Sequence, residues 1–357
     1  MVIVKSIDIE DFRGVKRLKE PLELGKFNIL LGRNCIGKSS ILQALFLVNL
    51  PCDEVQLPLY TMSSKSYLKA LTGKWNYLIY GYSGDAHLTF KLQTKGLRKA
   101  VDTKKFSTQG EFSSASEETL LKLGKGELNL EIFLSASTES VNCKIDEENL
   151  TQEKLRELAI MLNPEGQLLG IYIPNDTNFY KLLHEYAYKN MDGITKRGLH
   201  VKVFQEFLRE TISDKFTEVF PRENELYARK ELKDTVLYIR LNDLGEGVKR
   251  GVLTYFAIEY INPAIILWDD IEVAAHPSLL DATIKWLAES ERQVVLSTHS
   301  VDVLESFVRV EPRDAKVIML KKDKEDIISY KSLTLDEVED LLDEGIDPRK
   351  IVEGTVP

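Results

Sequence analysis

The sequence reads Gly32-Arg33-Asn34-Cys35-Ile36-Gly37-Lys38-Ser39 near its start, which is the G-x-x-x-x-G-K-S pattern of a phosphate-binding loop. The loop follows a strand-like run at Phe27–Leu31 and precedes a helix-like run at Ile41–Phe46. Its glycines let several backbone N–H groups face one anion, and the N-terminus of the helix adds positive potential. We expect Lys38 to contact the β- and γ-phosphates of a nucleotide and the Ser39 hydroxyl to bind Mg²⁺. An ordinary glycine turn before a helix is the alternative, and it fits the Lys-Ser pair less well.

The composition is typical of a globular protein in water. Of 357 residues, 43% are hydrophobic and 29% are charged, which allows a full core and two or three domains. No apolar run approaches the ~18–20 residues of a membrane helix, and the N-terminus lacks the features of a signal peptide. The three cysteines are scattered, which argues against a disulfide framework or a zinc site. We therefore expect a cytoplasmic protein with no membrane partner.

The net charge of −9 excludes a surface that is basic throughout. Binding to DNA or RNA needs only a local basic face, and two clusters are candidates for one. They are Arg13, Lys16, Arg17 and Lys19, and Lys95, Arg98, Lys99, Lys104 and Lys105. Such clusters are more often ordinary solvated surface, so the composition leaves nucleic-acid binding open.

The C-terminal third predicts a second part of a nucleotide site. The apolar run Ile265–Trp268 is typical of a strand buried on both faces, and it ends in Asp269 and Asp270. At the carboxyl end of that strand, Asp269 is placed to hold Mg²⁺ directly or through water. The alternative is a buried strand whose two acids only face solvent.

Two further elements flank this strand in the sequence. Gly245, Glu246 and Gly247 precede a helical apolar pattern at residues 252–258, so they predict a helix N-terminus that is available to an anion. His299 follows another expected strand. There it is a candidate for contact with a γ-phosphate or with the attacking water.

These elements resemble, in their order and spacing, the ABC-class ATPase heads of the RecF, SMC and OLD-nuclease type. Residues 7–14 are similar to the N-terminal strand and Phe-Arg turn of that family, and Asn34 stands where its phosphate loop has asparagine. Residues 244–250 resemble its signature segment, and residues 270–277 resemble the acidic segment with His-Pro that follows its Walker B strand. His299 matches its switch histidine.

The resemblance implies an α/β fold, namely a P-loop NTPase of the ABC-ATPase type with a mixed sheet core, an antiparallel β subdomain and a helical lobe. We expect residues 1–357 to form a single head. Its expected parts are a nucleotide-binding core at 1–50 and 235–330, a β-rich insert at 51–165, a helical lobe at 166–234, and a C-terminal helix and tail at 331–357.

The resemblance also implies the residues of the site and its ligands, ATP and Mg²⁺. The implied nucleotide-binding residues are Arg13, Gly32, Arg33, Asn34, Cys35, Ile36, Gly37, Lys38, Ser39, Ser40, Gly245, Glu246 and Gly247. Lys38, Asp270 and His299 are the implied catalytic residues, and Ser39 and Asp269 are the implied metal ligands. In such heads the signature glycines of one subunit contact the nucleotide of the other, so ATP is expected to stabilise a homodimer.

The sequence departs from the family pattern directly after the Mg²⁺ aspartate. The family has a glutamate there, which polarises the attacking water, whereas this chain has Asp270, whose side chain is one methylene shorter. A displacement of about 1 Å can cost on the order of 100-fold in rate, so slow turnover is expected. Glu272 is a conceivable substitute, although in this motif it is expected to face a neighbouring loop. Ile271 replaces the usual proline, and Gly245 stands at the signature serine position.

Periodicity alone predicts the secondary structure of the middle and the end of the chain. Alternating runs at residues 77–80, 87–90 and 128–134 predict strands, and i, i+3, i+4 spacings between residues 179 and 212 predict helices. A hairpin-like pair is expected at residues 226–228 and 236–239. Near the end, residues 316–320 and 327–330 predict a strand pair, and residues 335–342 predict an acidic amphipathic helix.

Two functions remain open at this stage. The first is an ATPase that dimerises around ATP and drives a partner, such as a separate effector or nuclease or a nucleic-acid transaction, in DNA repair or defence. The second is a nucleotide-dependent scaffold with negligible hydrolysis. A transporter subunit fits less well, because the phosphate loop and the signature lie further apart than in transporter heads. The nuclease domain of OLD-type proteins does not fit in the short segment after His299.

Overall fold

The computed structural model describes residues 2–52, 64–93, 127–146, 148–149, 169–212 and 214–351. The second basic cluster, at residues 95–105, lies outside these ranges. Most described strands belong to one mixed sheet of 13 strands, and three others form a separate small sheet. No helix of the described residues combines the length and the apolar character needed to span a membrane.

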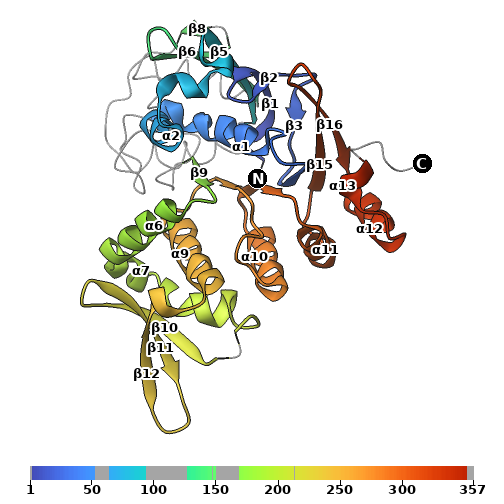
Figure 1. The fold of residues 1–357 in the computed structure, drawn as a ribbon. Helices are drawn as coiled ribbons and strands as arrows, with labels where there is room; N and C mark the ends of the chain where they lie inside the picture. The colour runs from blue at the N-terminus through green and yellow to red at the C-terminus, as the bar shows by residue number, and fades with distance from the viewer. Residues whose placement is uncertain are drawn as a thin grey trace, which may run out of the picture.

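The centre of the large sheet is parallel and carries the site. Its strands, in spatial order, are β9 (Gly170–Ile173), β13 (Ile265–Trp268), β14 (Gln293–Thr298), β4 (Phe27–Leu31) and β15 (Ala315–Lys322). The first four are fully buried because helices cover both faces, which explains why their sequences are continuous apolar runs. Helix α1 (Lys38–Phe46) lies on one face, and α9 (Glu246–Ile261), α10 (Pro277–Glu289) and α11 (Val301–Val310) lie on the other (Figure 1).

The remainder of the large sheet is mainly antiparallel and lies on the α1 side of the molecule (Figure 1). Its main strands are β1 (Val4–Phe12), β2 (Val15–Leu18), β5 (Asp85–Gln93), β6 (Glu127–Ser135) and β7 (Ser140–Ile145). The short strands β3 (Leu22–Glu23) and β8 (Glu148–Asn149) pair with β1 and β7. Strand β16 (Ile327–Leu333) joins the two parts, since it pairs antiparallel with β15 and parallel with β2. The strands expected around residues 87–90 and 128–134 are therefore confirmed, as is the final strand pair.

The strand expected at residues 77–80 is wrong. After helix α2 (Ser64–Thr72), the chain forms a 3₁₀ turn at Trp75–Leu78 and then a single bridge between Ile79 and Phe12. Trp75 and Leu78 are both buried, and the indole N–H of Trp75 donates a hydrogen bond to the carbonyl of Ser135 (2.7 Å). Three residues separate these two side chains, so the turn buries both on one side, which an extended strand would not do.

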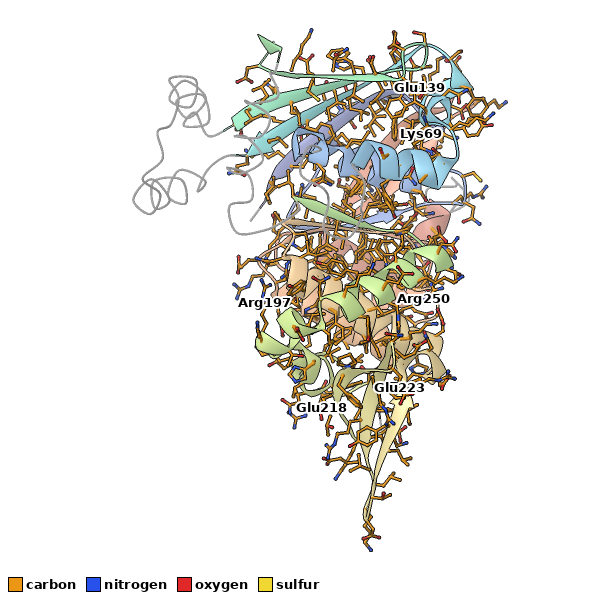
Figure 2. All side chains as sticks on the ribbon, turned by 90° about the vertical axis from the view of Figure 1, so that its left-hand side faces the viewer. Lys69, Glu139, Arg197, Glu218, Glu223 and Arg250 are labelled. Atoms are coloured by element: carbon orange, nitrogen blue, oxygen red, sulfur yellow. The ribbon has the colours of Figure 1, made fainter. Side chains whose placement is uncertain are left out.

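A second lobe lies on the opposite side of the core sheet from α1 (Figure 1). Its helices are α6 (Thr177–Lys189), α7 (Met191–Lys196), α8 (Leu199–Lys202) and a π-helical turn (Val203–Phe207), and they pack around α9. The small antiparallel sheet of β10 (Phe216–Arg222), β11 (Glu225–Glu231) and β12 (Val236–Arg240) follows them. It projects from the lobe, and Figure 2 shows Glu218 and Glu223 on this projection.

The lobe differs in two ways from the helical segment expected at residues 166–234. The segment contains β10 and β11 of the projecting sheet, so it is not wholly helical. It also contains β9, which pairs with β13 in the core sheet. Its four residues are all buried there. The expected pairing of residues 226–228 with residues 236–239 is confirmed between β11 and β12.

The C-terminal segment begins later than expected. Strand β16 continues to Leu333, and the acidic helix α12 (Leu335–Asp343) follows directly, as predicted. Thr334 and Glu337 form a reciprocal capping box that satisfies the first N–H groups of this helix. A short helix α13 (Pro348–Ile351) ends the described chain and carries Arg349, whose guanidinium donates to the carbonyl of His299 (2.8 Å).

Candidate nucleotide-binding site

The phosphate loop forms one wall of a cavity of about 390 Å³. The loop joins β4 to α1, and the residues that line the cavity are Arg13, Gly14, Arg33, Asn34, Cys35, Ile36, Gly37, Lys38, Ser39, Ser40, Asp270 and Lys322. Gly37 has φ of 110°, and a Cβ there would lie 2.7 Å from a methyl of Ile328. Both facts require glycine at this position, so the local sequence fixes the shape of the loop.

Lys38 is buried and folds back over the loop. Its ammonium group donates to the carbonyls of Gly32 (2.8 Å) and Arg33 (3.3 Å). Burial lowers the pKa of Lys38, and the nearby carboxylates of Asp270 and Asp269 oppose this shift. The loop thus holds a partly desolvated cation at the N-terminus of α1, which is an arrangement suited to a phosphate chain.

Asp269 ends β13 and is 7% exposed. Its Oδ1 accepts a short hydrogen bond from Ser297, its Oδ2 accepts one from the hydroxyl of Tyr172 (3.2 Å), and Ser39 donates to the same carboxyl group. Burial raises the pKa of Asp269, and these hydrogen bonds oppose the shift. The structure therefore brings together the hydroxyl and the carboxylate that were predicted to bind Mg²⁺. Oxygen donors beside a phosphate loop fit this ion.

A buried chain of hydrogen bonds links Asp269 to Arg13. The amide nitrogen of Gln43 donates to the hydroxyl of Tyr172 (3.1 Å), and Arg13 donates a short hydrogen bond to Oε1 of Gln43. Arg13 lies in the tight turn between β1 and β2 with φ of 53°, and burial lowers the pKa of its guanidinium. Sequence reasoning missed Tyr172 and Gln43. The available signal was a polar Gln43 within the apolar run of α1.

Asp270, Glu272 and His299 form a cluster beside the cavity. Nδ1 of His299 lies 2.9 Å from Oε1 of Glu272 and 3.5 Å from Oδ1 of Asp270. Asp270 has φ of 48°, and its backbone N–H donates to the hydroxyl of Ser297 (2.9 Å). Because Asp270 lines the cavity, the shorter acid does reach the space next to the loop.

The glycines at the start of α9 lie outside this cavity. Gly245 is the N-cap of α9, is exposed and has open space around it. A Cβ on Gly247 would lie only 2.3 Å from the carbonyl oxygen of Ala274, so this glycine allows α9 to touch the segment after Asp270. Glu246 forms ion pairs with Lys249 (2.6 Å) and Arg250 (2.9 Å). Gly245 and Glu246 are thus exposed and Gly247 is partly buried, and none of the three is among the described residues that line the phosphate-loop cavity.

Comparisons with known proteins place the fold. A family model described as "Protein of unknown function (DUF2813)" matches residues 1–69. No curated protein matches the chain. Solved SMC head domains are similar over nearly the whole chain, with 10–13% identity.

Three of these structures illustrate the similarity. An Smc head bound to the C-terminal winged-helix domain of ScpA has a TM-score of 0.61 and 13% identity, with 95% of this chain and 99% of that chain covered. An Smc head with an extended coiled coil from Pyrococcus furiosus, bound to the C-terminal domain of ScpA, has a TM-score of 0.60 and 13% identity. The alignment covers 96% of this chain and 99% of that chain. An Smc head with a coiled coil and joint from Pyrococcus yayanosii has a TM-score of 0.57 and 10% identity, with 97% of this chain and 100% of that chain covered. This likeness confirms the predicted fold class, a P-loop NTPase of the ABC type.

Proposed function

We propose that this protein is an ATP-driven switch that binds ATP and Mg²⁺ in the phosphate-loop cavity and closes around them with a second copy of itself. The supporting observation is the division of the site. Lys38, Ser39 and Asp269 lie together at the loop, whereas Gly245 at the start of α9 is exposed outside the cavity. Among the described residues, no side chain caps the N-terminus of α9, and the acid in its first turn, Glu246, is paired with two basic residues of the same helix. On a head of this fold, such a terminus suits the nucleotide of a partner subunit.

The residues divide the work within each site. The backbone N–H groups of the loop and Lys38 hold the phosphates. Ser39 and Asp269 would hold Mg²⁺, which would supply positive charge to the phosphate oxygens. Asp270, which lines the cavity, would accept a hydrogen bond from the attacking water, and Nδ1 of His299 lies 3.5 Å from Oδ1 of Asp270. Gly245 and Gly247 offer backbone N–H groups to the nucleotide of the second subunit.

A partner would respond to the closed state. Two of the similar structures are Smc heads bound to a domain of ScpA, so a protein partner is consistent with this fold. We propose a separate effector or nuclease, in DNA repair or defence, as in the RecF and OLD-like groups that the motifs resemble. Nucleic acid is a further ligand that we propose, because three basic residues in β2 and directly after it are exposed, namely Lys16, Arg17 and Lys19.

Hydrolysis as a function of protein concentration tests the shared site. The rate of Mg²⁺-dependent ATP hydrolysis per subunit should rise steeply with concentration, and Lys38→Ala should abolish it. A rate per subunit that is independent of concentration, in the range where dimers form, would contradict the shared site. Asp270→Asn should trap the ATP-bound dimer, which light scattering can size and from which co-purified protein or nucleic acid can be identified.

A scaffold with negligible hydrolysis is the second candidate, and the short side chain of Asp270 favours it. In that case ATP binding would still drive dimerisation, and Lys38→Ala would still prevent it. The two functions differ only in the rate of ATP turnover, and the substitution Asp270→Glu tests whether the short side chain limits that rate.

A further inference from the structure

Glu272 is held by the strand end that carries His299. It belongs to the segment between β13 and α10, and its side chain is only 13% exposed. Its Oε1 accepts a hydrogen bond from the backbone N–H of His299 (3.0 Å), and its Oε2 accepts one from the hydroxyl of Thr298 (2.9 Å). Both carboxylate oxygens are therefore engaged by one short segment, residues 298–299.

The same carboxylate also faces the imidazole ring. Oε1 of Glu272 lies 2.9 Å from Nδ1 of His299, so the ring must carry its proton on Nδ1 to donate this bond. A neutral ring with its proton on Nδ1 leaves Nε2 as a free acceptor on the opposite edge. Glu272 is the nearer of the two carboxylates beside Nδ1, since Oδ1 of Asp270 lies at 3.5 Å, so its contact sets the tautomer and the direction of the ring.

This geometry decides between two roles for Glu272. A residue that polarises water needs a free oxygen in the cavity, and in the described structure Asp270 lines the cavity while Glu272 does not. We infer that Glu272 is a positioning residue, which holds His299 with Nδ1 protonated and presents Nε2 to the nucleotide or water. This inference rests on the proposed function for its effect on catalysis, but the tautomer of His299 stands apart from it.

A double-mutant cycle tests the catalytic part. Glu272→Ala should lower kcat for ATP hydrolysis about 10- to 100-fold, as loss of an orienting partner typically does, and should leave ATP affinity unchanged. Glu272→Gln should keep most of the activity, because its amide oxygen still accepts from His299 and its amide N–H₂ can donate to Thr298. In a His299→Ala background, Glu272→Ala should have no further effect.

Two outcomes of the cycle would overturn the inference. One is a further loss of rate when Glu272→Ala is added to His299→Ala, because Glu272 would then act directly. The other is a loss of ATP affinity equal to the loss of kcat, which would indicate a general structural defect. Failure of the proposed function would look different, since the wild-type protein would then show no hydrolysis that depends on Lys38.

Nuclear magnetic resonance tests the tautomer without nucleotide or activity. Long-range ¹H–¹⁵N spectra of the wild-type protein should show His299 protonated on Nδ1, with the resonance assigned by its loss in His299→Ala. In Glu272→Ala the ring should shift toward protonation on Nε2. An unchanged tautomer in this variant would refute the role assigned to Glu272, whether or not the protein hydrolyses ATP.

Discussion

At the scale of a single residue, burial of the Asp269 carboxylate is expected to lower the free energy of unfolding of the nucleotide-free protein. A carboxylate that is 7% exposed has lost most of its water, and three hydroxyl donors replace only part of that solvation. The pKa of Asp269 is therefore raised in spite of these hydrogen bonds. The Mg²⁺ that we propose at this place would supply the missing counter-charge.

Replacement of this acid should stabilise the nucleotide-free protein. Because the pKa of Asp269 is raised in the folded state, the folded protein keeps a proton that the unfolded chain loses near the ordinary value of 3.8. The contribution of Asp269 to the free energy of unfolding therefore falls as the pH rises above 3.8, and at neutral pH it is lower than in acid. Asp269→Asn removes this penalty, since Tyr172 and Ser297 can rotate their hydroxyls to accept from the amide.

Thermal melts from pH 4 to pH 8 measure the effect. The melting temperature of Asp269→Asn should exceed that of the wild type by about 1–3 °C at neutral pH, and the difference should shrink toward pH 4. Hydrolysis that depends on Mg²⁺ should be lost in the same variant. Equal melting temperatures across the range would show that burial of Asp269 carries no penalty.

Under the proposed function, we expect Asp270 to affect the rate of hydrolysis rather than the affinity for ATP. Its side chain lines the cavity, but it ends about one methylene short of the position that a glutamate reaches. Asp270→Glu should raise kcat about 10- to 100-fold and leave the affinity for ATP nearly unchanged. Single-turnover hydrolysis together with equilibrium binding of a fluorescent ATP analogue separates the two quantities. If kcat falls instead, the positive φ of 48° at Asp270 already places the shorter acid for catalysis.

At the scale of elements, one segment lies between His299 and the start of α9. The stretch from Asp270 to His276 contacts His299 through Glu272 and approaches Gly247 through the carbonyl of Ala274. A change at the phosphate loop therefore has a short path to the surface that we propose faces the partner subunit. The two glycines of that surface differ in what they tolerate, which gives a matched pair of variants.

Gly247→Ala should destabilise the fold, and Gly245→Ser should not. A Cβ at 247 would overlap the carbonyl of Ala274 at 2.3 Å, and forced packing of this kind costs about 1–3 kcal/mol. At 245 nothing lies within 4 Å, and serine is a better N-cap than glycine by a few tenths of a kcal/mol. Denaturant unfolding without nucleotide measures both effects. Equal loss of stability in the two variants would contradict the packing of α9 on the Asp270 segment.

The sequence predicted the elements that have their own local pattern. The phosphate loop has glycines and Lys-Ser at fixed spacing, and Ile265–Trp268 and Gln293–Thr298 are apolar runs of strand length. Strand β9 was not predicted because its four residues adjoin a helical pattern and only pairing with β13 defines them. The contacts of Tyr172 and Glu272 could not be predicted from the sequence for a similar reason. Their partners are distant in sequence and come together only when the sheet is formed.

At the scale of the whole molecule, the proposed shared site follows from where the phosphate loop and the start of α9 lie. The core sheet lies between α1, which follows the phosphate loop, and α9 (Figure 1). Gly245, the N-cap of α9, is exposed. In the part of the chain that the structure describes, residues 245–247 do not line the phosphate-loop cavity of their own chain, and we propose that two chains related by a twofold axis bring the two surfaces together at each of two nucleotides. The same geometry explains why ATP would act as a link between subunits, because it contacts both only in the closed dimer.

Subunit mixing tests this arrangement in full. Lys38→Ala removes the phosphate loop's cation, and Gly245→Asp places a carboxylate where the partner's phosphates would approach while keeping a good N-cap. Each variant alone should be inactive, since both sites of each homodimer are damaged. In a mixed dimer, one site combines both defects and the other combines two intact halves. A 1:1 mixture should therefore recover about a quarter of wild-type hydrolysis if subunits exchange at random and the sites act independently.

The matched control is Lys38→Ala mixed with Lys38→Ala/Gly245→Asp, which contains no intact phosphate loop and should stay inactive. No recovery in a mixture whose heterodimers are demonstrated by differently tagged subunits would show that each nucleotide is bound and hydrolysed within one chain.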